Sequence, residues 1–142
     1  MEPVKFLVVE DNELDVLRLK TVLKDMGVAC SLSVVKDGEK AVDYMLKRHG
    51  FEGVPDPDLI FLDLHLPKLN GVEVLQAVPN SRKLPLCVVT GSEVERDEMK
   101  NLFGIRRIAY LVKPVNRYGI LNCFRMYEHL WPVAEEVSSA LS

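Results

Sequence analysis

Side chains that can take part in phosphate or metal chemistry stand where the apolar segments of this chain end. They are Glu10 and Asp11 after the first segment, Asp63 after the third, Thr90 after the fourth and Lys113 after the fifth. Clustered carboxylates repel one another unless a cation is present, and hard oxygen ligands suit Mg²⁺, which keeps several of its waters. A carboxylate nucleophile, a divalent ion, a lysine and a hydroxyl are the recurring parts of phosphoryl transfer to a carboxylate. These residues therefore predict phosphoryl chemistry if the fold brings them together.

The apolar segments are predicted to be strands of a parallel sheet. The unbroken run from Leu59 to Leu62 is typical of a strand that is buried on both faces. Further strands are predicted at 6–9, 30–35, 86–89 and 108–112, and helices at 13–26, 39–48, 72–78, 93–103 and from 116 or 117 to 130. This alternation of five strands with five helices predicts an α/β fold with right-handed crossovers. The carboxyl ends of the strands then lie at one edge, where such sheets bind ligands.

Helix signals support these boundaries. Val16, Leu19 and Leu23 are spaced to form one apolar face, and Gly27 is placed to end that helix. The last helix is expected to end at Trp131-Pro132, because proline disfavours helix at the residue before it. Residues 1–132 are thus expected to form one domain, with a short tail at 133–142.

Composition narrows the classes of function. The 142 residues are 48% hydrophobic and 27% charged, with a net charge of −3, so no basic surface for nucleic acid is expected. No apolar run approaches the roughly 20 residues that span a bilayer, and the first residues lack a signal-peptide core, so a cytoplasmic protein without membrane contact is expected. The three cysteines are widely spaced among apolar residues, which favours buried thiols over a disulfide or a metal site.

Each candidate residue also has a structural interpretation. Lys113 before Pro114 is, taken alone, more typical of a surface turn. Thr90 suits a strand or a helix cap, and Tyr110 suits the core as well as a functional role. The histidines share no ligand spacing, so a zinc site is not expected. Only the common register of the acids, Thr90 and Lys113 at strand ends favours function.

The chain resembles the receiver domain of two-component response regulators. The resemblance covers about residues 4–130 and is carried by Val8-Val9-Glu10-Asp11-Asn12, Leu62-Asp63-Leu64 with Leu66-Pro67 and Asn70-Gly71, Val89-Thr90-Gly91, and Tyr110-Leu111-Val112-Lys113-Pro114. It implies a flavodoxin-like doubly wound sheet with strand order 2-1-3-4-5.

The resemblance also implies a role for each matching residue. Asp63 is expected to accept the phosphoryl group, and Asp11 to bind Mg²⁺ directly. In the family pattern Glu10 would act on the metal through water, and the backbone carbonyl of His65 would complete the protein ligands. Lys113 would pair with the phosphoryl group. Thr90 would be the switch hydroxyl and Tyr110 the switch aromatic.

Within the family, the chain looks most like the stand-alone regulators of phytochrome-type histidine kinases. The supporting features are Glu10-Asp11-Asn12, Asp37-Gly38, the Gly/Pro loop from Gly50 to Asp58, the run from Leu62 to Lys68, and Trp131. His65 departs from the asparagine usual in this subgroup, which puts the rate of autodephosphorylation in question.

The resemblance implies a signalling switch rather than an enzyme. A sensor histidine kinase, with a bacteriophytochrome as the candidate, would phosphorylate Asp63, and water would later remove the phosphoryl group. A homodimer through the fourth helix, fifth strand and fifth helix is expected, with Tyr127, Leu130 and Trp131 as candidate contacts.

Two other classes remain open at this point. A pseudo-receiver would bind partners without ever being phosphorylated, although the complete set of acids with Thr90 and Lys113 argues against it. A phosphatase of the haloacid-dehalogenase type would use an aspartate nucleophile, but it needs a second acid two residues later, where this chain has His65.

Overall fold

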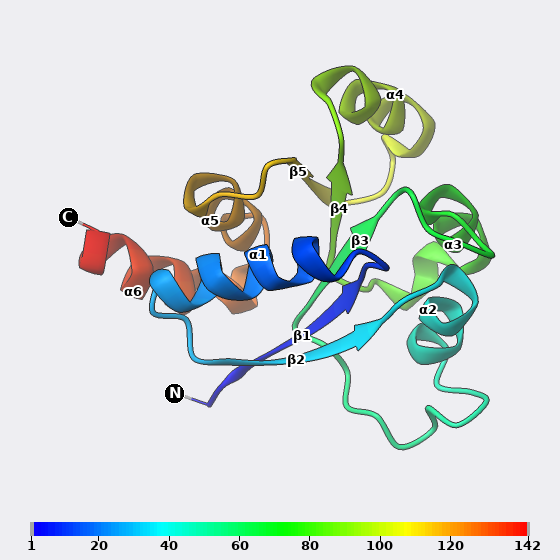
Figure 1. Cartoon of the computed structure of the whole chain (residues 1–142), viewed down its shortest axis with the longest axis horizontal. Helices are drawn as coiled ribbons and strands as arrows, with labels where there is room; N and C mark the ends of the chain where they lie inside the picture. Colours follow the sequence, from blue (N-terminus) through cyan, green and yellow to red (C-terminus); the bar gives the residue numbers. More distant parts are fainter. Residues whose placement is uncertain (1, 142) are drawn as a thin grey trace.

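The computed structural model describes residues 2–141 as a five-stranded parallel sheet with helices on both faces (Figure 1). The strands are β1 (Val4–Val9), β2 (Cys30–Val35), β3 (Leu59–Asp63), β4 (Leu86–Thr90) and β5 (Ile108–Val112). Their order is β2-β1-β3-β4-β5, and each neighbouring pair is parallel. The flavodoxin-like doubly wound sheet expected from the sequence is confirmed.

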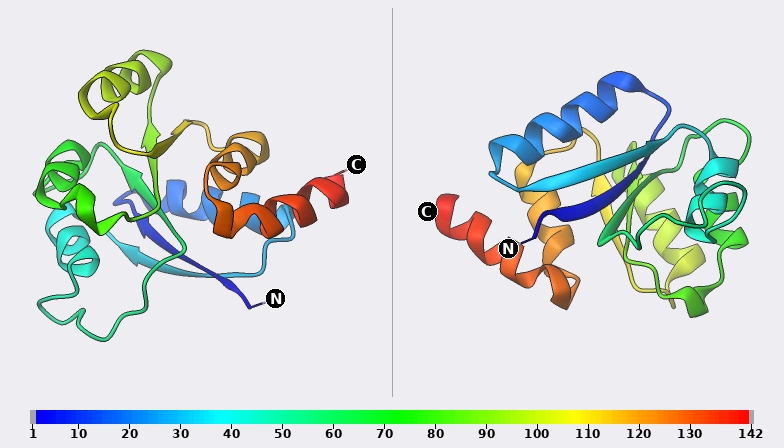
Figure 2. Two further views of the ribbon diagram at one scale, coloured as in Figure 1. Left: turned by 180° about the vertical axis from the view of Figure 1, so that it is seen from behind. Right: turned by 90° about the horizontal axis from the view of Figure 1, so that it is seen from below.

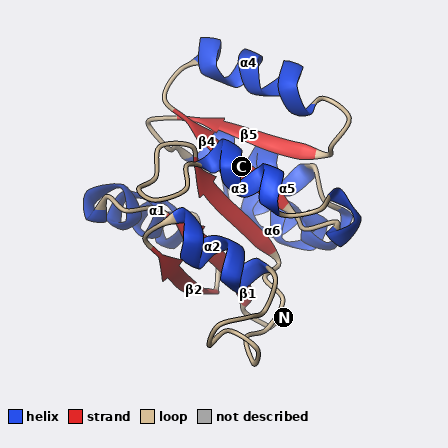
Figure 3. Ribbon diagram, turned by 90° about the vertical axis from the view of Figure 1, so that its right-hand side faces the viewer, coloured by secondary structure: helices blue, strands red, loops and turns tan. Residues whose placement is uncertain are grey.

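Two apolar cores fill the space between the sheet and its helices. The α-helices of the described chain are α1 (Glu13–Asp25), α2 (Gly38–Met45), α3 (Gly71–Ala77), α4 (Glu93–Phe103), α5 (Arg117–Arg125) and α6 (Trp131–Leu141), with short 3₁₀ turns η1 (Asn80–Arg82) and η2 (Glu128–Leu130). One core lies under α1, α5 and α6, and the other lies under α2, α3 and α4 (Figure 2). Figure 3 shows α4 at the β4–β5 end of the sheet. Met99 is its one buried residue.

Burial explains why the central strands lack polar alternation. Every residue of β3 and β4 is buried, because each strand has a neighbour on both sides and helices on both faces. β2 is an edge strand with exposed positions. The carboxyl end of β3 consequently carries a carboxylate, Asp63, that is only 4% exposed.

The loop after β3 is held by α2 and α3. Asn70 and Glu73 form a capping box at the start of α3, each accepting a backbone N–H from the other. Gly38, the first residue of α2, packs against this loop so closely that an added Cβ would lie 1.9 Å from the carbonyl oxygen of Leu69. The Asp37-Gly38 turn therefore needs glycine for close approach.

The expected end of helical structure at Trp131-Pro132 is wrong. α5 ends at Arg125, and α6 begins at Trp131 and includes residues 133–141, which were expected to form a tail. Proline lacks an N–H and fixes φ, so it is tolerated in the first turn of a helix, where the N–H has no helical acceptor. Val133, Ala134 and Val137 of α6 are buried in the core under α1 and α5. The described chain therefore has six α-helices rather than five.

Tyr127 and Leu130 were expected on a dimer surface, but both are buried. The Tyr127 hydroxyl donates to the Leu86 carbonyl oxygen at 2.5 Å and accepts the Leu86 N–H at 3.1 Å. Leu130 is 2% exposed. Of the three candidate contacts only Trp131 is exposed, at 49%, so Tyr127 and Leu130 are core residues.

The three cysteines are free thiols, and the expected burial holds for two of them. Cys87 of β4 and Cys123 of α5 are buried with their sulfur atoms 2.8 Å apart, and Cys30 is half-buried on the edge strand. Burial raises the pKa of the Cys87 thiol well above its ordinary value.

Candidate functional site

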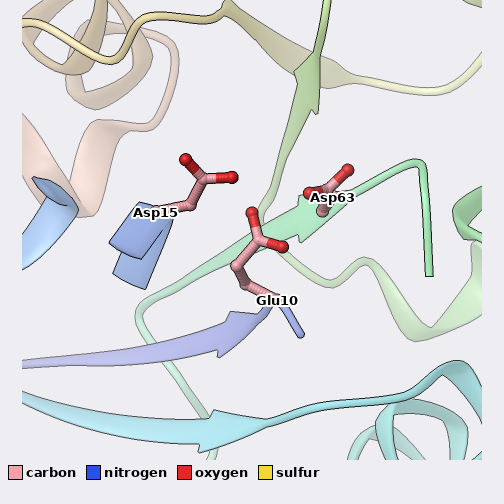
Figure 4. Close-up of side chains that lie close together, drawn as sticks. All are labelled: Glu10, Asp15 and Asp63. Atoms are coloured by element: carbon pink, nitrogen blue, oxygen red, sulfur yellow. The ribbon is translucent and has the colours of Figure 1, made fainter. Parts of the chain in front are cut away.

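Three acids and one lysine meet at the carboxyl edge of the sheet. Glu10 follows β1, Asp63 ends β3, and Asp15 lies in the first turn of α1. One carboxylate oxygen from each lies within 4.8 Å of the others (Figure 4), and these three residues form what we call the acidic group. Lys113 follows β5, and its backbone N–H donates to the Thr90 carbonyl oxygen at 2.8 Å. The convergence predicted for Glu10, Asp63 and Lys113 is therefore present in the fold.

The Lys113 ammonium group lies between the three acids. Its Nζ is 2.9 Å from Asp63 Oδ2, 3.1 Å from Glu10 Oε1 and 2.8 Å from Asp15 Oδ2. Glu10 and Asp63 are buried, whereas the Asp15 side chain is 37% exposed. A single positive charge thus compensates a buried acidic group, which opens onto a cavity of about 400 Å³ that runs between β1, β3 and α1.

The two buried acids differ in protonation. Burial, with the hydrogen bond and the charge of Asp63, raises the pKa of Glu10 to about 8. Burial also disfavours the Asp63 carboxylate, but hydrogen bonds from Glu10, the His65 N–H and Lys113 lower its pKa overall. Close acids share protons in this way, because two neighbouring negative charges repel each other. The site therefore favours the ionised form of the Asp63 carboxyl and disfavours that of Glu10.

The Lys113 ammonium stays charged despite its partial burial. Burial lowers its pKa, but the hydrogen bonds that it donates to Asp15, Asp63 and Glu10, together with the charge of Asp63, raise its pKa above the ordinary value. The Lys113 ammonium lies among carboxylate oxygens, as a Mg²⁺ ion does in its binding sites. The donor set therefore fits a hard divalent ion, and Lys113 stands in for that positive charge.

Asp11 and His65 flank the acidic group in different ways. The Asp11 side chain is exposed, and its carboxylate is not among the three that gather around Lys113. The His65 N–H donates to Asp63 Oδ1 at 2.8 Å, so its backbone lies against the acceptor carboxylate. The expected metal contacts of Asp11 and of the His65 carbonyl stay predictions.

Asp15 was not predicted from the sequence. Asn12 caps α1 by accepting the N–H groups of Leu14 and Asp15, which places Asp15 in the first turn. Acids are common in that turn because they favour the positive end of the helix dipole, so the sequence offered an ordinary explanation. The feature of the sequence that could have indicated Asp15 was its position in the first helical turn after Glu10.

Thr90 is the last residue of β4, and Tyr110 lies in the middle of β5. Thr90 is fully buried, and its hydroxyl donates to the Ser92 carbonyl oxygen at 3.2 Å, within its own loop. Tyr110 is half-buried in the core under α4, and the Lys100 ammonium lies 5.7 Å from its ring centroid. Both residues contact α4 or the loop before it, and their expected switch roles stay predictions.

Comparison with known proteins agrees with this geometry. The model of the response regulator receiver domain family matches residues 6–125. Response regulator Rcp1 of a Synechocystis species is 31% identical over 132 residues, which cover 91% of this chain and 89% of Rcp1. A regulatory protein of Methanothrix harundinacea, FilR2, is described as a probable methanogenesis regulator and is 31% identical over 92% of this chain and 84% of its own.

Solved structures give the same relationship. The bacteriophytochrome response regulator AtBRR has a TM-score of 0.78 at 31% identity, covering 89% of this chain and 93% of its own. The Mn²⁺-bound form of response regulator Rcp1 has a TM-score of 0.66 at 29% identity, covering 96% and 93%. Within residues 2–141, no helix combines the length and apolar composition needed to cross a bilayer. The chain belongs to the response regulator receiver-domain family, and its relatives include phytochrome-associated regulators.

Proposed function

We propose that this chain is a phospho-accepting signalling switch that receives its phosphoryl group on Asp63 from a sensor histidine kinase. The observation that carries the proposal is the contact of the Asp63 carboxylate with the Lys113 ammonium, 2.9 Å apart, in an acidic group suited to Mg²⁺. Similarity to bacteriophytochrome response regulators supports a phytochrome-type kinase as the donor.

The chemistry is an in-line displacement at phosphorus. A carboxylate oxygen of Asp63 attacks the phosphoryl group of a phosphohistidine, the P–O bond forms, and the P–N bond breaks. The leaving imidazole of the kinase keeps the electron pair and takes up a proton. Asp63 is suited to attack because its lowered pKa keeps it ionised, while Lys113 balances charge on the phosphoryl oxygens.

The acids at the edge of the sheet would hold the metal. Bound Mg²⁺ supplies positive charge that neutralises the phosphoryl oxygens during transfer. Asp63, Asp11 and the His65 carbonyl would bind the ion directly, and Glu10 would act through water. Asp11 is exposed and directly follows Glu10, and its carboxylate would have to turn toward the ion. Lys113 would then pass from the acids to the phosphoryl group.

The switch would follow from the added charge. A phosphorylated Asp63 attracts hydroxyl and ammonium donors, which favours a turn of the Thr90 hydroxyl away from Ser92. Tyr110 would then move into the space that Thr90 leaves and alter the face made by α4, β5 and α5. Exposed apolar side chains on α4 and the turn after it, Val94, Leu102 and Ile105, suit this face to a second copy of the chain.

Phosphotransfer tests the proposal. Purified chain is incubated with a radiolabelled phytochrome-type histidine kinase and Mg²⁺, beside the Asp63→Asn variant. Label should pass to the parent and not to Asp63→Asn, and chelation of Mg²⁺ should stop it. Equal binding of both forms to a kinase with no label transfer would instead support a pseudo-receiver. Sedimentation of the phosphorylated parent should show a dimer, and a monomer would remove that part of the proposal.

A further inference from the structure

The first turn of α4 carries a further carboxylate, Glu95, which contacts the loops after β3 and β4. Glu95 occupies the third position of α4, and its backbone N–H donates to the Oγ of Ser92, the residue that caps the helix. Ser92 and Glu95 have the spacing of a capping box. In that motif the Glu95 side chain would return to the N–H of Ser92, as Glu73 does for Asn70 in α3.

The Glu95 side chain makes different contacts. Its Oε1 accepts the N–H of Gly91 at 3.0 Å, one residue before the cap, and its Oε2 lies 2.7 Å from Nε2 of His65. A carboxylate only accepts hydrogen bonds, so Nε2 of His65 carries the hydrogen. The Glu95 side chain is 24% exposed, although that of His65 is 72% exposed. Glu95 therefore links two loops that are far apart in sequence.

Both loops border Asp63. The His65 N–H donates to Asp63 Oδ1, and Asp63 pairs in register with Val89, two residues before Gly91. Gly91 directly follows Thr90, whose hydroxyl is held by the Ser92 carbonyl oxygen. The Thr90 hydroxyl and the Gly91 N–H thus both have hydrogen-bond acceptors, and the acceptor of the Gly91 N–H is the Glu95 carboxylate.

We propose that Glu95 is a positioning residue that acts as an internal anion: it occupies the Gly91 amide and the His65 ring, and a phosphoryl group on Asp63 must displace it. This inference rests on the proposed function. The negative charge that arrives on Asp63 competes for the same loop donors and repels the Glu95 carboxylate. Release of Glu95 frees His65 and Gly91 together, so the two loops change in one step.

Removing the competing carboxylate should favour phosphorylation. The full chain, Glu95→Gln and the control Glu93→Gln are phosphorylated with acetyl phosphate and Mg²⁺, and the rate is followed by intact mass. Glu93 is an exposed acid in the same first turn, so its variant removes the same charge near the helix terminus. Because Glu95→Gln weakens two partly exposed hydrogen bonds to a carboxylate, its phosphorylation rate should increase by about threefold to tenfold. Glu93→Gln should match the parent.

His65→Asn tests whether the two contacts act as a unit. This variant lacks the ring that contacts Glu95, so its phosphorylation rate should also increase. The rate of the double variant should increase by less than the product of the two single effects. A structural defect would lower the rate, so an increase separates positioning from misfolding. A Glu95→Gln rate equal to or below that of the parent overturns the proposal.

Amide spectra keep this test separate from the proposed function. In ¹⁵N-labelled chain without phosphodonor, Glu95→Gln should shift the Gly91 amide and speed its hydrogen exchange, while Glu93→Gln should leave it unchanged. An unshifted Gly91 amide overturns the contact. If this amide shifts but no form of the chain accepts a phosphoryl group, the proposed function fails and the competition fails with it, while the contact stands.

Discussion

Replacing Lys113 by methionine should expose how strongly the acidic group depends on a cation. Lys113 contacts Asp63, Glu10 and Asp15 at 2.8–3.1 Å, and its own side chain is 30% exposed. Breaking a fully buried ion pair by removing one partner costs about 3–5 kcal/mol. Partial exposure of Lys113 lowers that figure, and so does the raised pKa of Glu10, about 8, which disfavours a second negative charge beside Lys113 at neutral pH. We therefore expect a loss of about 2–3 kcal/mol in unfolding free energy without metal.

Magnesium should compensate for this loss. An ion that binds only the folded state adds about 1.4 kcal/mol of stability at ten times its dissociation constant. Because Lys113 competes for the same oxygens, the Lys113→Met variant should bind Mg²⁺ more tightly than the parent and gain more stability from it.

Urea unfolding with EDTA and with Mg²⁺ measures both effects. Lys36→Met is the matched control, since Lys36 pairs with Glu13 on the surface and the side chains are 60% and 84% exposed. It should change the unfolding free energy by about 1 kcal/mol or less and should not alter the response to Mg²⁺. If Lys113→Met were as stable as the parent in EDTA, or if Mg²⁺ stabilised both equally, the counter-ion interpretation would be refuted.

Three further predictions concern the scaffold. Gly38→Ala should destabilise the fold by about 1–3 kcal/mol because its Cβ would overlap the Leu69 carbonyl, whereas Gly53→Ala, with open space around it, should be near neutral in chemical denaturation. Val137→Ala should cost about 1–3 kcal/mol because α6 packs this side chain into the core, and the exposed Glu136→Ala should change stability by about 0.5 kcal/mol or less; equal effects would place α6 outside the cooperative unit. Burial raises the pKa of Tyr127 to about 12, so the neutral phenol is favoured in the fold and its stabilising contribution is complete below about pH 10; the advantage of the parent over Tyr127→Phe should shrink by about 2–3 kcal/mol between pH 10 and 12, and a constant difference would contradict the shift.

Much of the fold follows from local patterns. The apolar runs of β3 and β4 predicted strands correctly, because a strand with neighbours on both sides and helices on both faces favours apolar side chains along most of its length. The end of α1 near Gly27 and the start of α3 at Asn70-Gly71 also follow from local preferences for caps and for positive φ, which Gly27 adopts. These features depend on residues within one turn of each other.

The C-terminal region shows where local patterns fail. Proline is compatible with the end of one helix and with the first turn of the next, so Pro132 alone could not distinguish the two. The apolar face of a helix likewise does not indicate whether it packs against the core of its own chain or against a partner. Tyr127 proved to be a core residue because its hydroxyl bonds the backbone of Leu86, which lies 41 positions earlier in the chain.

By itself, the sequence determined where the strands end and which side chains stand at those ends: Asp63 and Thr90 end their strands, and Glu10 and Lys113 directly follow theirs. Only the tertiary structure decided which of these side chains contact one another. Parallel register brings Lys113 to within hydrogen-bonding distance of Asp63 across 50 residues, adds Asp15 to the acidic group, leaves Asp11 exposed and joins Glu95 to His65. The physical reason is that apolar period and capping act along the chain, whereas the electrostatics of a site depend on distances through space, which follow from sheet order, crossover direction and side-chain rotation.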